Sequence, residues 1–89
     1  MPQIILNEKL IFVFEPSGKK IRLVITEADE ELVCRKETLK NLQCFLAEEQ
    51  AHLFKGRLQL FKSGDEIDVK VKNEIVGKIS VQNFQHALN

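Results

Sequence analysis

Two cysteines and two histidines are the residues best suited to metal chemistry, and they occur in the order Cys34, Cys44, His52 and His86. A structural zinc site usually draws such ligands from close pairs, for example Cys-x-x-Cys or His-x-x-x-His. The gaps between these four residues are long and irregular, so the sequence predicts no metal and no other cofactor. We expect both thiols to be free and to act as small buried apolar groups. The histidines are expected on or near helix surfaces.

A run of carboxylates is the second feature with chemical potential. Glu27, Asp29, Glu30 and Glu31 lack the alternating ligands and the glycine of a calcium loop, and we interpret them as a solvated acidic loop. Neither cysteine has a sequence neighbour that suggests a general base. The glycines are isolated, so there is no glycine-rich phosphate loop. The chain is therefore predicted not to be an enzyme.

Basic and aromatic residues form a more informative pattern once strand alternation assigns each side chain to a face. If Ile21, Leu23 and Ile25 face the helices, the residues between them face away. We extend the same alternation to Ile11 and Val13, which places their neighbours outside. The predicted outer face of the sheet then carries Phe12, Phe14, Phe61, Arg22, Arg35, Lys70, Lys72 and Lys78.

Two kinds of partner fit such a face. Exposed phenylalanines on one sheet face form an apolar patch, and a homodimer or another protein partner would bury it. Basic groups interleaved with aromatic rings also suit single-stranded nucleic acid, because the cations attract phosphates and the rings stack on bases. The first interpretation, a non-enzymatic and self-associating interaction module, is preferred, and single-stranded nucleic-acid binding is the alternative.

Strands and turns must position these residues, and their signals are clear along most of the chain. Strands rich in β-branched and aromatic residues are expected at 3–6, 9–15, 20–26, 31–35, 57–61, 66–72 and 75–79. Pro16 to Lys19 and Ser63 to Asp65 are expected to be turns. Thr38 and Ser80 are predicted N-caps. The first helix is expected to run to about Phe54 and the second through Leu88.

The two halves of the sequence resemble each other. Thr38 to Leu46 aligns with Ser80 to Leu88, with Asn and Gln in the same register, and Phe14 aligns with Phe61 if one gap is allowed. This indicates an internal pseudo-repeat of about residues 9–54 and 56–89 in a single domain, 1–89. The predicted fold is α+β, an antiparallel sheet from two similar strand-strand-strand-helix halves with both helices packed on one sheet face.

Composition limits the classes of function. The 89 residues carry 13 basic and 13 acidic side chains, so the net charge is zero, which argues against a surface devoted to duplex DNA. The N-terminal sequence lacks a signal-peptide pattern, and no apolar run approaches a membrane-spanning length. Together with only two cysteines, these features predict a cytoplasmic protein that does not enter membranes.

Overall fold

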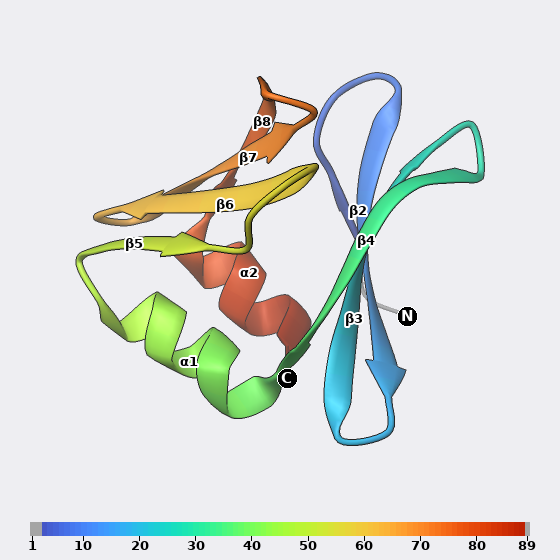
Figure 1. Cartoon of the computed structure of the whole chain (residues 1–89). Coiled ribbons are helices and arrows are strands. Elements are labelled where there is room, and N and C mark those ends of the chain that lie inside the picture. Colours follow the sequence, from blue (N-terminus) through green and yellow to red (C-terminus); the bar gives the residue numbers. More distant parts are fainter. Residues whose placement is uncertain (1–2, 89) are drawn as a thin grey trace.

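The computed structural model describes residues 3–88, which form two four-stranded antiparallel sheets and two helices (Figure 1). The elements of the first half are β1 (Gln3–Ile5), β2 (Leu10–Ser17), β3 (Lys20–Glu27), β4 (Glu30–Thr38) and α1 (Leu39–Ala47). Those of the second half are β5 (Gln50–Leu53), β6 (Leu58–Ser63), β7 (Glu66–Val71), β8 (Glu74–Ser80) and α2 (Val81–Leu88). The chain is thus α+β, as predicted.

Short turns connect strands that are neighbours in the chain, so each sheet is a simple meander in the order β1-β2-β3-β4 or β5-β6-β7-β8. The turns at Ala28-Asp29 and Lys72-Asn73 have positive φ angles at both residues, as a two-residue hairpin turn that matches strand twist requires. Gly18 and Gly64 supply the positive φ in the other two turns. The predicted acidic loop is therefore only a two-residue turn.

The expectation of one sheet with both helices on a single face is wrong, because the strands form two separate sheets. The strands of one sheet run across those of the other, and the helices lie beside each other at one end of the molecule (Figure 1). Helix α1 contacts β4 and β5, whereas α2 contacts β1 and β8, so each helix bridges the two sheets. Since α1 intervenes between β4 and β5, these strands remain the unpaired edges of different sheets.

One hydrophobic core fills the space between the sheets and the helices. Its aromatic centre is Phe14, whose ring centroid lies 4.8 Å from that of Phe12 and 5.2 Å from that of Phe84. Leu23, Ile67 and other aliphatic side chains from both sheets surround these rings. Burial of this apolar surface drives the association of the two halves.

Helix α1 is shorter than predicted, because the chain leaves helical geometry at Glu48, which has φ −87° and ψ 146°. Helical spacing predicts one buried stripe of Leu39, Leu42, Leu46 and Leu53 with Phe45 beside it. Leu42 and Phe45 are buried, but Leu39 is exposed and Leu53 belongs to β5. The apolar residues Ala51 and Leu53 fit both a continued helical stripe and a short strand with alternating faces. The apolar pattern alone therefore did not show that the helix ends before them.

Both predicted N-caps are confirmed. The Thr38 hydroxyl accepts a hydrogen bond from the Asn41 amide at 3.2 Å, and the Ser80 hydroxyl accepts one from the Asn83 amide at 3.1 Å. Each satisfies a backbone donor that the first helical turn leaves unpaired.

The segment after β1 contacts the edge strand β8 directly. Asn7 Nδ2 donates to the Val76 carbonyl at 3.0 Å, and a Cβ on Gly77 would lie 3.0 Å from the Leu6 side chain. A larger residue at this position would crowd Leu6, so glycine favours the close approach. No helix within residues 3–88 has the length and apolar character needed to span a membrane.

Candidate functional site

The predicted outer placement of Phe12 and Phe14 is wrong, since their exposed fractions are 0% and 2%. Phe12 lies opposite Ile25 and Phe14 opposite Leu23 in the β2–β3 ladder, so all four side chains share the core face. Ser17 pairs with Lys20 across a two-residue turn, which puts even-numbered residues of β2 opposite odd-numbered residues of β3. The length of this turn was the signal in the sequence that would have corrected the assignment.

The pseudo-repeat alignment carries the same error. Counted back from Gly18 and Gly64, Phe61 occupies the position of Glu15, and no gap is needed. The gap that aligned Phe61 with Phe14 changed the face of the strand.

The outer face of the first sheet is consequently apolar at its centre. Val13, Val24 and Cys34 form one row across the strands, and Ile5 and Ile11 lie in the next row. Ile5 is 75% exposed. We call these five residues the first-sheet patch.

Arg22 borders the first-sheet patch and is paired with acids. Its guanidinium lies 3.4 Å from Glu15 and also bonds Glu31. The Glu31 hydrogen bond raises the pKa of Arg22, which stays charged. Arg22 is therefore on the outer face as predicted, but its charge is already compensated.

The outer face of the second sheet contains the predicted Phe61, Lys70 and Lys78 around a ring stack that the sequence did not reveal. The His52 imidazole lies parallel to the Phe61 ring, with a centroid distance of 4.3 Å and an interplanar angle of 4°. The ammonium of Lys70 is 5.6 Å from the Phe61 centroid, within cation–π range. Gln59 Oε1 is 3.2 Å from His52 Nε2 and orients the imidazole.

Lys78 and Lys72 contribute less to this surface than predicted. Lys78 Nζ lies 2.8 Å from Glu66 and 4.0 Å from Asp68. The hydrogen bond that Lys78 donates to Glu66 raises the pKa of Lys78, and the two acids compensate its positive charge. Lys72 lies in the β7–β8 turn with a positive φ, beyond the end of the strand.

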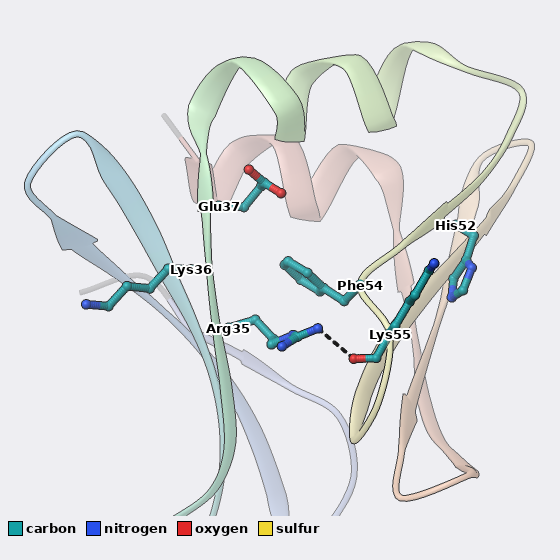
Figure 2. Close-up of a pocket in the computed structure, with 6 residues that line it drawn as sticks. All are labelled: Arg35, Lys36, Glu37, His52, Phe54 and Lys55. Carbon is teal, nitrogen blue, oxygen red and sulfur yellow. Dashed lines mark hydrogen bonds between the residues drawn. The ribbon is translucent and has the colours of Figure 1, made fainter.

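Arg35 lies elsewhere, in a groove between the edge strands β4 and β5 (Figure 2). The groove has a volume of about 440 Å³. Arg35 Nη2 donates to the Lys55 carbonyl at 2.6 Å, and its guanidinium carbon lies 5.5 Å from the Phe54 ring centroid. Figure 2 shows Arg35 and Phe54 pointing into the groove, whereas Lys36 points away on the other side of β4. The groove continues into two smaller hollows that share Arg35, Glu37, His52 and Lys55 with it.

An ordered carboxylate lies where the groove meets α1. Glu37 Oε1 accepts hydrogen bonds from Asn41 Nδ2 and from the Thr38 amide, both at 2.8 Å. The Asn41 bond, followed by the Thr38 bond, holds the pKa of Glu37 below its ordinary value of 4.5. Glu37 is thus committed to the start of the helix and stays ionised.

The groove and the second-sheet face join at His52, which lines the groove and stacks on Phe61. We call the combined surface the basic–aromatic strip. It consists of Arg35, Phe54, Lys55, His52, Phe61 and Lys70. Sequence reasoning missed His52 and Phe54 because it extended the first helix over them, and no glycine or proline between Ala47 and Phe54 marks the end of the helix.

The thiols do not contribute to the strip. Cys34 is half-buried, but Cys44 is exposed on α1, so its predicted burial is wrong. Position 44 lies outside the α1 stripe that carries Leu42 and Phe45. Across the described part of the chain, no three His, Cys, Asp or Glu side chains group closely enough to hold a metal ion.

No family model, curated protein or solved structure matches this chain in comparisons with known proteins. Function is therefore inferred from the geometry of the two surfaces.

Proposed function

We propose that this chain is a non-enzymatic module that binds single-stranded nucleic acid along the basic–aromatic strip. The observation that carries the proposal is the His52–Phe61 stack at the β5 edge of the second sheet, with Lys70 beside Phe61. His52 is exposed and stands on the edge strand β5, so a base can continue the stack beyond the imidazole. Base–aromatic stacking of this kind is tolerant of sequence.

The distribution of charge supports a strand rather than a duplex. Arg35 on β4, Lys55 after β5 and Lys70 on β7 are spread over the strip, whereas Lys78 is paired with Glu66 and Asp68. Few free cations suffice for a flexible strand that also gains stacking, but duplex binding without base contacts depends on many phosphate contacts. The zero net charge of the chain agrees with this reading.

A titration of a fluorescent single-stranded oligonucleotide, with matched duplex as competitor, tests the proposal. Phe61→Leu removes the ring that holds the His52 imidazole in its stacked position, and should weaken binding by up to about 1–3 kcal/mol, the contribution of one base–aromatic stack. Lys70→Ala should reduce the slope of log affinity against log salt by about 0.7 if it contacts one phosphate. Lys19→Ala, at an exposed turn far along the chain from the strip, is the control. Equal affinity for strand and duplex, or wild-type binding by Phe61→Leu, would contradict the proposal.

The first-sheet patch supports a second candidate function, which is self-association. Ile5 is 75% exposed beside the partly exposed Ile11, Val13 and Cys34, while Val24 between them is already buried. Monomers rarely leave large contiguous apolar surface uncovered. An isologous contact between two copies would cover it. This is the outer-face association expected from the sequence, moved from the phenylalanines to aliphatic residues.

Oligomeric mass in solution distinguishes this candidate. Ile5→Glu and Val13→Glu should each yield monomers from a dimeric wild type. Ile75→Glu, which changes an isoleucine that is 65% exposed on the other sheet, should leave the dimer intact. A monomeric wild type at high concentration would rule this function out without affecting the nucleic-acid proposal.

The similarity of the halves remains a proposal about origin. Four strands followed by one helix occur twice, and Thr38 and Ser80 cap their helices through the amide three residues later. Duplication of one unit would account for both features, with each unit burying the apolar face of the other.

A further inference from the structure

Phe54 has a backbone conformation that hairpin geometry does not explain. Within residues 3–88, the other four non-glycine residues with positive φ, at 28, 29, 72 and 73, are paired in two-residue turns, which require that geometry. Phe54 has φ 70° immediately after β5, in a loop where a bulky side chain disfavours this region. Such an outlier persists only where the surroundings enforce it, and outliers of this kind concentrate at ligand sites.

The consequence of this conformation is the position of the ring. Phe54 points into the β4–β5 groove instead of continuing the alternation of β5 (Figure 2). The ring is only half-buried, and the guanidinium of Arg35 lies over it. Arg35 is itself exposed and is held by the Lys55 carbonyl at 2.6 Å. The planar Arg35 guanidinium thus covers one face of the half-buried Phe54 ring.

Resting on the proposed function, we propose that this groove receives one unpaired base from the strand bound along the second sheet. The base stacks on Phe54 in the position now taken by the Arg35 guanidinium, and Arg35 turns to a neighbouring phosphate. The groove volume of about 440 Å³ lies within the range of small-molecule pockets. Because His52 lines both the groove and the outer face, a strand stacked on His52 reaches Phe54 by crossing β5.

An extended peptide fits this groove less well, although two sheet edges border it. The four-residue length of β5 limits the ladder that an added strand can form there. On β4, charged residues line the edge at Arg35, Lys36 and Glu37, a common protection against strand addition. A base stacked on Phe54 needs neither edge to be paired.

The test is a ladder of single-stranded oligonucleotides of about 4 to about 16 nucleotides, the range of site sizes of single-strand binders. Wild-type affinity should rise in two steps, as the second base site becomes reachable. Phe54→Leu should remove the second step, a loss of about 5- to 150-fold for long oligonucleotides, and leave short ones unaffected. Phe54→Tyr, which keeps an aromatic ring, should restore the second step. Phe61→Leu should weaken binding at every length.

Arg35→Ala and Lys36→Ala form a matched pair, because these adjacent residues of β4 point to opposite sides of the strand (Figure 2). Only Arg35→Ala should alter the affinity of long oligonucleotides. If Phe54→Leu, folded by circular dichroism, binds every length as the wild type does while Phe61→Leu binds weakly, the groove inference is overturned and the proposed function stands. If the wild type binds no oligonucleotide, both fall together.

Discussion

Lys62 reaches from the core face of β6 to the end of α1, where its ammonium donates to the main-chain carbonyl of Glu48. Lys62 is only 7% exposed. The last turn of α1 contains no basic residue, so the positive charge favoured at a helix C-terminus comes from the second sheet. This contact ties the helix of one half to a strand of the other.

Removal of that amine should destabilise the whole fold. Lys62→Met keeps the apolar stem but leaves the Glu48 carbonyl without its donor, and should cost about 1.5–3 kcal/mol, the range for hydrogen bonds to charged groups. Urea denaturation measures the loss. Lys19→Met, at an exposed turn residue, is the control and should leave the midpoint unchanged. A midpoint for Lys62→Met equal to that of the control would show that the contact does not stabilise the protein.

Two phenylalanines on opposite faces of their sheets should respond differently to the same substitution. Phe14→Ala removes a ring from the centre of the core and should cost about 3–5 kcal/mol of stability. Phe61→Ala removes a half-exposed ring and should cost less than Phe14→Ala, because less apolar area is lost from the folded state. Chemical denaturation of both variants compares them directly. Equal losses would contradict the assignment of Phe14 to the core and Phe61 to the surface.

The two helix caps should contribute similarly. Thr38→Ala and Ser80→Ala each remove the hydroxyl that accepts the amide hydrogen bond of the first turn, and each should lower the unfolding free energy by about 0.5–2 kcal/mol. Replacement by Gly should cost less, because glycine leaves the backbone amide open to water. A loss confined to one of the two positions would argue against their equivalence.

Glu37 should make stability depend on pH in the acid range. Its pKa is lower in the folded chain, chiefly through the Asn41 hydrogen bond, so the unfolded chain binds the proton more readily. This stabilisation is present above the ordinary value of 4.5 and is lost as the pH falls through the lower folded value. Wild-type stability should therefore fall more steeply than that of Glu37→Gln below pH 4.5. Asn41→Ala should reproduce part of the change, and parallel pH curves would contradict it.

Lys78 should matter less than Lys70 for nucleic-acid binding, because Glu66 already holds its ammonium at 2.8 Å. Lys78→Ala is expected to change oligonucleotide affinity little, whereas Glu66→Gln should release Lys78 and strengthen binding at low salt. Salt-dependent titrations of the single and double variants measure the coupling. A larger effect of Lys78→Ala than of Lys70→Ala would place the ligand on the β8 side of the sheet.

Much of the fold was predictable, because local interactions specify it. Three kinds of local signal act within a few residues. They are the turns that need a positive φ at Gly18 and Gly64, the hydroxyl caps Thr38 and Ser80, and the alternation of Ile67 and Val69. The sequence by itself therefore determined the α+β class, most strand positions, both helix starts and the outward direction of Phe61.

Contacts between segments decided which residues enter the core, where the first helix ends and where the groove forms. Leu10 to Phe14 is apolar on both faces of β2, so alternation within β2 leaves open which side enters the core, and the pairing of Phe14 with Leu23 across the β2–β3 turn settles it. Leu53 fits the apolar pattern of either a helix or a strand, and pairing with Leu60 places it in β5. The groove at Arg35 and Phe54 exists because the edges of two different sheets, joined through α1, come together there. Such contacts depend on long-range packing, which residue spacing within one segment does not specify.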